Sequence, residues 1–463
     1  MQVRGCFPSS KINLPSPFAR VRSDLLMRSK SSGFGHNPTF TLLIIAWVLR
    51  YLFVSFMPAE ARSADSYSWQ NAAVWLSNGQ NPYVQSSTLN WPPVWMQVIY
   101  LMDKVSLALN VPFVQVLRIV LTGFESLVIV ALFKFIRQIA PQVNAFVPIL
   151  LGIAVNPTAI FLNCQHGNFD VIIALWILLF IWQLVQYHRS RSETDWLAAC
   201  FFLGLGIVTK TVPLVLCPML AGGLRRVAPK TRWLGAALVF GPVILGMSVI
   251  YVLAPADITA KVLTYRSSSG WFGISGLLHL AGADSLIGLT NALFYLLLVT
   301  AEALVAWVFW KRERLEPREI ILCAAMFLVA IPGVGPGFSP QYLYWSLPLL
   351  IAAYALCAKG MRWAVLAFGM VSALTCIVEY AIVPSHGMFL YYMIKEAGVT
   401  TLPPTLVRSI NWFAMPLGEV VMRLPLFVTF LVLLATGIRL LVRTLANPAG
   451  AGEPAFKKGK TGK

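Results

Sequence analysis

The chain has 463 residues, of which 58% are hydrophobic and only 12% are charged. Soluble domains carry about a quarter charged residues, so this composition excludes an ordinary soluble enzyme. The formal net charge of +18 would raise the question of nucleic acid in a soluble protein. Here the basic residues lie between apolar segments, which indicates membrane helices and no nucleic-acid partner.

Apolar runs recur along the chain at a length of about twenty residues, the length that an α-helix needs to cross a bilayer. The pattern predicts an all-α, polytopic transmembrane bundle of about twelve spans. The expected spans are residues 39–57, 113–135, 143–162, 169–187, 196–210, 212–224, 233–254, 286–310, 320–333, 340–357, 361–383 and 424–442. One membrane domain then covers residues 39–443, and segments 1–38 and 444–463 are expected to be flexible cytoplasmic tails.

Lys and Arg gather in alternate connections between these spans. The basic connections hold Arg20, Arg22, Arg28 and Lys30, then Lys134 and Arg137, Arg189 and Arg191, Arg225, Arg226, Lys230 and Arg232, Lys311, Arg312, Arg314 and Arg318, Lys359 and Arg362, and Lys457 to Lys463. The positive-inside rule places them in the cytoplasm together with both termini. The other connections, near 58–112, 255–285, 334–339 and 384–423, are then outward.

The first outward connection has helical features of its own. In residues 66–79, apolar positions recur at helical spacing, as in a helix that lies flat at the membrane surface, and Asn78-Gly79 ends it. The run 94–108 is short and is broken by Asp103 and Lys104. We therefore expect two interfacial helices here rather than spans.

Asp65 is one of few charged residues expected at the outward face. As the amino-terminal cap of the first interfacial helix, its carboxylate would accept backbone N–H bonds. Such a position would also keep the carboxylate ionised, which suits a general base. Both interpretations are open from the residues alone.

His166 and Asp170 lie in the stretch CQHGNFD between two expected spans. They are four residues apart, but Gly167 between them makes a pairing along one helix uncertain. A zinc site needs more ligands, and the chain has only five histidines, so we expect no metal. The alternative for Asp170 is a helix cap.

Two isolated cations belong to the same face. Lys210 interrupts an apolar stretch, so it either reaches to the interface or faces a polar cavity, and Pro213 is expected to break the helix there. Arg266 lies beside Ser and Gly in an outward connection, where it is either an anchor or a phosphate ligand. Near Tyr342, Tyr344 and Trp345, an aromatic belt explains all but Gln341.

This inventory fits sugar transfer from a lipid phosphate, which needs one base and cations for the departing phosphate. The ordered segments ADSYSW, AVWLSNGQNPY, LNWPPVW, NPTAIFLNCQHGNFD, GLGIVTKTVPLVLCP and FSPQYLYWSLPLL resemble the GT-C superfamily of membrane glycosyltransferases over most of residues 40–360. They are most similar to mannosyltransferases that use polyprenyl-phosphate sugars, including the catalytic subunit of the first GPI mannosyltransferase and bacterial relatives.

The resemblance implies that Asp65 is the base, that Trp91-Pro92-Pro93 is the family's aromatic-Pro-Pro element and that Lys210 is the family's lysine. It also implies inversion at the sugar and no required metal. Dolichyl-phosphate-glucose glucosyltransferases are similar too, but they have Asn at the place of Asp170 and a His-Glu-Lys element where this chain has Ser339 to Tyr342. The second difference favours mannose.

The sequence therefore predicts a hexosyltransferase at the non-cytoplasmic membrane face, without a cofactor. Asp65 is the expected base, Lys210, Arg266 and His166 the donor-phosphate ligands, and Asp170, Gln341, Tyr342, Tyr83 and Trp91 the rest of the pocket. The expected partners are membrane lipid, the lipid-linked sugar and a glycan, glycolipid or protein acceptor, and an accessory membrane subunit is compatible with them.

Two other classes stay open. A lipid-sugar flippase or transporter would use charged residues along a central pathway, for which the candidates are Arg50, Arg118, Glu125, Glu302 and Glu379. A scaffold subunit without catalysis would need Asp65, Lys210 and Arg266 to lie far apart.

Overall fold

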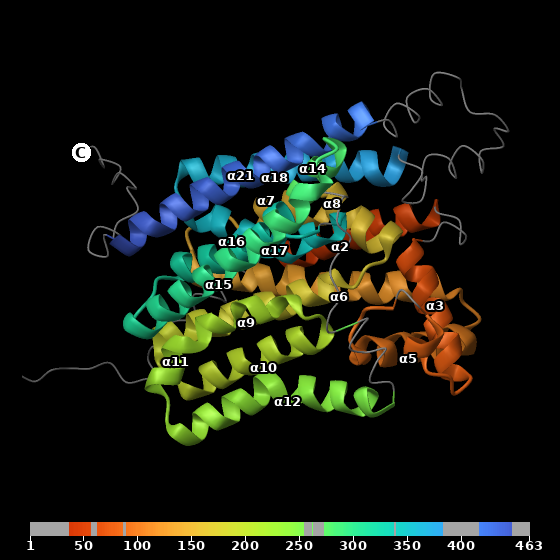
Figure 1. Ribbon diagram of the computed structural model, residues 1–463, viewed down its shortest axis with the longest axis horizontal. Helices are drawn as coiled ribbons and strands as arrows, with labels where there is room; N and C mark the ends of the chain where they lie inside the picture. The colour runs from red at the N-terminus through yellow and green to blue at the C-terminus, as the bar shows by residue number, and fades with distance from the viewer. Residues whose placement is uncertain are drawn as a thin grey trace, which may run out of the picture.

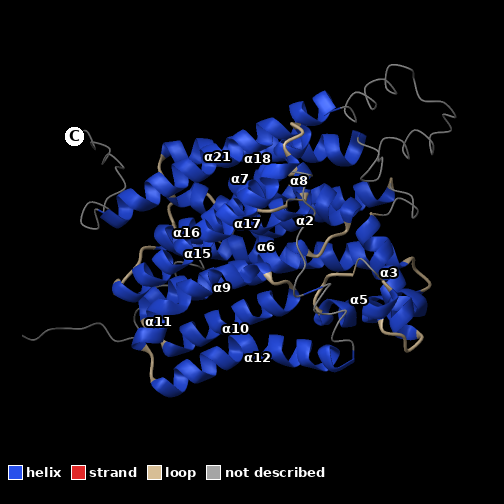
Figure 2. Cartoon of the chain, viewed as in Figure 1, coloured by secondary structure: helices blue, strands red, loops and turns tan. Residues whose placement is uncertain are grey.

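The computed structural model describes residues 37–56, 63–86, 89–253, 262, 273–337, 339–382 and 416–446. In these ranges the chain is a bundle of helices joined by short loops (Figure 1). Figure 2 shows no strand in this part of the chain, which confirms the all-α prediction. The expected tails 1–38 and 444–463 lie almost entirely outside the described residues.

The helices follow one another closely along the chain. They are α2 (Pro38–Ser55), α3 (Ala64–Ser77), α4 (Pro82–Gln85), α5 (Pro93–Leu109), α6 (Phe113–Ile139), α7 (Phe146–Ile149), η1 (Leu150–Ala154), α8 (Pro157–Ile160), η2 (Phe161–His166), α9 (Asp170–Ser190), α10 (Glu193–Thr209), η3 (Val212–Leu220), α11 (Ala221–Arg226), α12 (Pro229–Leu253), α14 (Gly273–Leu280), η5 (Asp284–Leu286), α15 (Ile287–Lys311), α16 (Pro317–Val334), η6 (Pro340–Tyr342), α17 (Leu343–Leu356), α18 (Lys359–Ile377), η7 (Val378–Ile382) and α21 (Pro416–Ala446).

Eight helices in the described ranges are long and apolar enough to cross a membrane, and a bent pair makes nine. The chain is thus an integral membrane protein. Three further expected spans correspond to shorter elements, which are α10 with 17 residues, η3 continued by α11, and α17 with 14 residues. At a rise of about 1.5 Å per residue, α10 extends roughly 25 Å. The expected number of about twelve spans stays a prediction.

The bent pair turns by 47° between Phe146–Ala154 and Pro157–His166. Proline cannot continue the hydrogen bonding of the preceding helix, so Pro157 starts a new helix as its first residue. Asn156 caps that helix, because its Oδ1 accepts a bond of 2.8 Å from the backbone N–H of Thr158. This break directs the following segment, which ends at His166, toward α3.

A buried network satisfies the carbonyls that the break leaves open. Arg50 pairs with Glu125 at 2.7 Å and donates to the carbonyls of Ile153, at 2.9 Å, and Ala154. The Tyr344 hydroxyl donates to Glu125 at 2.9 Å. Arg50 and Glu125, two of the charges considered for a transport pathway, therefore form an ion pair between helices. Buried charges need such a partner.

The connection after the first span, residues 58–112, forms helices over its described residues, as expected. α3 covers the predicted helical stretch and is followed by Gly79 with φ +70°. α5 packs on α3 through tryptophans, since the ring centres of Trp69 and Trp95 are 5.1 Å apart. These helices lie at one end of the bundle, whereas α11 lies at the other (Figure 1).

Candidate functional site

Asp65 lies in the first turn of α3 but does not cap that helix. Ser63 is the cap, and its Oγ accepts a 3.1 Å bond from the backbone N–H of Ser66. The cap interpretation of Asp65 was therefore wrong. Its Oδ2 instead accepts bonds from Nε2 of His166, at 2.9 Å, and Nδ2 of Asn168, at 3.0 Å.

These contacts decide the ionisation of Asp65. Burial acts to raise the pKa of this carboxyl group, but the bond and charge of His166, the charge of Lys210 and the bond from Asn168 outweigh it. Together they hold the pKa below 3.8. Asp65 is thus a carboxylate at neutral pH, and its side chain is still 26% exposed. Among the described residues, no donor contacts its Oδ1.

His166 reaches Asp65 because the chain turns sharply after it. Gly167 has φ +68°, a conformation that a side chain disfavours, and ends η2. The Ser63 hydroxyl donates to the carbonyl of His166 at 2.5 Å and ties the turn to α3. On the other side of the ring, Nδ1 of His166 lies 2.8 Å from the hydroxyl of Tyr380. The imidazole is held on both nitrogens.

Asp170 begins α9, and its carboxylate pairs with Lys210 instead of capping the helix. Nζ of Lys210 lies 2.7 Å from Oδ1 of Asp170, and Asp170 is 2% exposed. The cap interpretation of Asp170 is also wrong. Because Gly167 breaks the helix, His166 and Asp170 do not pair with each other but hold Asp65 and Lys210, respectively.

Lys210 lies between two helices and has an extended backbone. This agrees with the helix break expected near Pro213. α10 ends at Thr209, and Lys210 has φ −157° and ψ 141°. Its ammonium lies over three rings, 5.4 Å from the centre of Phe169, 4.9 Å from Tyr342 and 5.0 Å from Trp345. Lys210 therefore faces a protein interior lined by aromatic rings rather than lipid.

The prediction of an aromatic belt near residue 342 was wrong. Tyr342, Tyr344 and Trp345 are all buried inside the chain, and Tyr342 stacks on Trp345 at 4.2 Å. A belt residue would face the lipid head groups. The rings instead surround Lys210 or, in the case of Tyr344, contact Glu125.

The other predicted pocket residues divide into three groups. Tyr342 contacts Lys210, and the neighbouring Gln341 is buried and accepts a bond from the Ser339 hydroxyl. The Tyr83 hydroxyl donates to the carbonyl of Trp91 at 2.6 Å, so this bond shapes the connection between α3 and α5. Arg266 lies outside the described residues.

Sequence reasoning missed several residues of this site. Asn168 directly follows Gly167, and its side-chain amide is able to donate to a carboxylate, as it does to Asp65. Phe169 stacks on Trp95 at 4.3 Å and so links the site to α5. Tyr380 comes from η7, 214 residues beyond His166, and no pattern near it in the sequence points to this contact.

The described residues contain no group of three or more His, Cys, Asp or Glu side chains arranged to hold a metal ion. The site built from them consists of two acid–base pairs, Asp65 with His166 and Asp170 with Lys210. Such an arrangement can take a proton at Asp65 and bind an anion at Lys210.

No protein-family model and no curated protein matches the chain. Among solved structures, the chain is similar to ArnT from Cupriavidus metallidurans, crystallised bound to undecaprenyl phosphate. The similarity covers 88% of this chain and 78% of that one, at 14% sequence identity and a TM-score of 0.49.

Proposed function

We propose that the chain is a membrane glycosyltransferase of the GT-C type, which transfers a hexose from a polyprenyl-phosphate donor to an acceptor hydroxyl. One observation carries the proposal. Asp65, His166 and Lys210 come from three distant segments, yet Asp65 is bonded to His166 and Asn168, and Asn168 also accepts a bond from the backbone N–H of Asp170, the partner of Lys210. A base and a cation in one site are the two groups that the reaction needs.

Asp65 acts as the general base. Its lowered pKa keeps Asp65 ionised. Its Oδ1 accepts the proton of the acceptor hydroxyl while the hydroxyl oxygen forms its bond to the anomeric carbon. His166 and Asn168 bond to Oδ2 and so fix the direction of the other oxygen. We propose His166 as a positioning residue for Asp65 in place of the phosphate contact expected from the sequence, because its two ring nitrogens already contact Asp65 and Tyr380.

Lys210 binds the phosphate of the donor. The bond between the anomeric carbon and the phosphate oxygen breaks, and the phosphate leaves with the electron pair and needs no proton because it is weakly basic. Lys210 compensates the charge that develops on it. Asp170 and the three rings hold Lys210 in place. Arg266 is proposed as a second phosphate ligand.

The family resemblance supports mannose as the transferred sugar, inversion at its anomeric carbon and a reaction without a cofactor. The position of the site supports the non-cytoplasmic face. α9 begins at Asp170 in the site and runs for 21 residues, about 30 Å, to the basic connection that holds Arg189 and Arg191. By the positive-inside rule that connection is cytoplasmic, with both termini.

A transfer assay tests the proposal. The full chain in proteoliposomes is given polyprenyl-phosphate mannose or glucose with a labelled sugar, and a lipid and glycan extract of the host membrane as acceptor. We expect label in the acceptor and released polyprenyl phosphate, with mannose preferred. Asp103→Asn, in the neighbouring helix α5, is the matched control for Asp65→Asn.

The expected result is transfer by the wild type and by Asp103→Asn, and none by Asp65→Asn at equal amounts of folded protein. Movement of the intact donor across the bilayer without any change in its glycosylation would contradict the proposal. That result would favour a flippase.

A further inference from the structure

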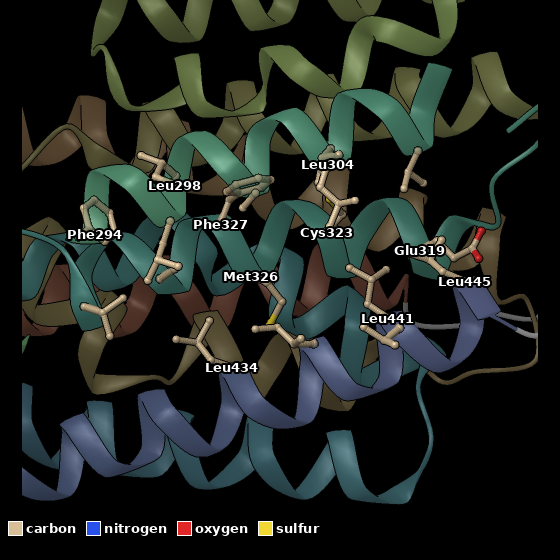
Figure 3. Close-up of a pocket in the computed structure, with 18 of the residues that line it drawn as sticks. Phe294, Leu298, Leu304, Glu319, Cys323, Met326, Phe327, Leu434, Leu441 and Leu445 are labelled. Carbon is tan, nitrogen blue, oxygen red and sulfur yellow. The ribbon is translucent and has the colours of Figure 1, made fainter. Parts of the chain in front are cut away.

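A long apolar groove lies between α15, α16 and α21, away from the residues around Asp65. Its volume is about 630 Å³, and Figure 3 shows its lining side chains from Phe294 at one end to Glu319 and Leu445 at the other. Leu304 of α15 and Leu441 of α21 line its length. The groove thus follows membrane helices along their axes, as the chain of a lipid would.

The end of the groove at Glu319 lies among the basic connections. Arg312 lies 3.3 Å from Glu319, which is 5% exposed at the rim. Phe309, another lining residue, meets the ring of His188 edge-on at 5.8 Å. This end therefore adjoins the last turn of α9, opposite the site at Asp170.

Buried donors without partners lie at this end. His188 is 2% exposed, and neither of its ring nitrogens has a hydrogen-bond partner among the described residues. Nη1 of Arg191 and Nε2 of Gln186 are also buried without a partner in this part of the chain. In either tautomer His188 presents one N–H. Buried donors are normally satisfied, so those of His188 and Arg191, which are three residues apart, indicate an absent acceptor, whereas Gln186 lies two residues from His188 and faces another side of α9.

The cluster carries an excess of positive charge. Arg226 donates to the carbonyls of Gly222 and Arg312, at 2.7 Å and 2.6 Å, and these bonds leave its charge in place. Its burial and the nearby charges of Arg191 and Arg225 lower the pKa of Arg226, and they outweigh the opposite effect of Tyr187 and Glu313. Cations that disfavour one another in this way would be stabilised by an anion.

We propose that the groove and this cluster form a binding site for an anionic phospholipid. Its phosphate accepts bonds from His188 and Arg191, and one acyl chain lies along the groove. Basic pockets between membrane helices on the cytoplasmic side suit such head groups. The lipid-linked donor of the proposed function would have its phosphate at Lys210, at the other end of α9, so the two sites are separate and this inference does not depend on the enzyme activity.

Native mass spectrometry of the purified full-length protein tests whether the site prefers an anionic head group. Dioleoyl phosphatidylglycerol and dioleoyl phosphatidylcholine are titrated separately, and the bound fraction gives a Kd for each. We expect phosphatidylglycerol to bind at least about tenfold more tightly, since charge-assisted bonds are the strong ones. Arg191→Asn should weaken it about tenfold because it removes a charged ligand of the phosphate, and it should keep the fold because Asn tolerates the positive φ of that residue. Arg189→Asn, an exposed neighbour that loses the same charge, should leave it unchanged.

Filling the groove with a larger side chain tests whether it holds the acyl chain of the lipid. Ala301 lines the groove, whereas Ala303 on the same helix is exposed and does not line it. Ala301→Phe should weaken phosphatidylglycerol binding, and Ala303→Phe should not. Equal binding of the two lipids, equal effects of Arg189→Asn and Arg191→Asn, no effect of Ala301→Phe, or displacement by equimolar inorganic phosphate would each overturn the proposal.

Discussion

Nε2 of His166 lies 2.9 Å from Oδ2 of Asp65, although 101 residues separate them along the chain. The contact joins the first turn of α3 to the end of η2 and gives the carboxylate a fixed partner. Asn168 also bonds to this carboxylate and accepts a bond from the backbone N–H of Asp170, so it links the pair of Asp65 and His166 to the pair of Asp170 and Lys210.

Lys210→Met should destabilise the protein because it leaves Asp170, which is 2% exposed, without its cation. Removal of one partner of a buried pair costs about 3–5 kcal/mol. The measurement is the midpoint of thermal unfolding in detergent. The double variant with Asp170→Leu should recover most of the loss without recovering sugar transfer. If Lys210→Met unfolds at the wild-type temperature, the pair has no structural role.

Tyr380→Phe removes the hydroxyl that lies 2.8 Å from Nδ1 of His166. We expect kcat to fall by about tenfold with KM unchanged, because the ring positions the base rather than the substrate. Steady-state kinetics with the sugar donor distinguishes the two constants. An increase in KM alone would mean that Tyr380 contributes to donor binding instead.

The pKa of Asp65 is lowered below 3.8, which predicts the pH dependence of its contribution to stability. A carboxyl group whose pKa is lower in the folded state stabilises that state above its unfolded pKa, and loses this effect as the pH falls through the folded value. Wild type should therefore unfold at a higher temperature than Asp65→Asn at neutral pH. The difference should shrink only below pH 3.8. A difference that already vanishes at pH 6 would show that the carboxyl group is not held ionised.

Gly167→Ala places a side chain on a residue with φ +68°, where the new Cβ would lie 3.3 Å from Cδ2 of Leu117. The conformation alone costs about 1–2 kcal/mol. Because the turn carries His166 and Asn168, we expect the rate of sugar transfer to fall by a larger factor than this loss of stability alone would cause. Gly123→Ala is the matched control, since nothing lies within 4 Å of its Cβ inside α6. Equal loss in both variants would mean that the turn at Gly167 has no special role.

Much of the fold follows from the sequence because membrane helices satisfy their own backbone groups. The helix after the first span, the break before Pro213 and the helix break at Gly167 are all local features. The span number is harder, because η3 and α17 are too short to be identified by length.

The site could be predicted by residue type but not by pairing. Asp65, His166, Asp170 and Lys210 were all identified, yet which carboxylate meets which cation depends on how the bent pair and α3 pack. Two of the rings around Lys210, those of Tyr342 and Trp345, are predicted to lie at the membrane surface because their local sequence is the same for a belt and for a buried cluster. Tyr380 comes from a segment that carries no local signal.

The most direct test measures donor binding and turnover together on Asp65→Asn and Lys210→Met. If Asp65 is the base and Lys210 the phosphate ligand, Asp65→Asn should bind polyprenyl-phosphate mannose within about twofold of wild type and lose at least about a hundredfold in turnover. Lys210→Met should lose about tenfold or more in affinity. Wild-type turnover by Asp65→Asn would contradict the account.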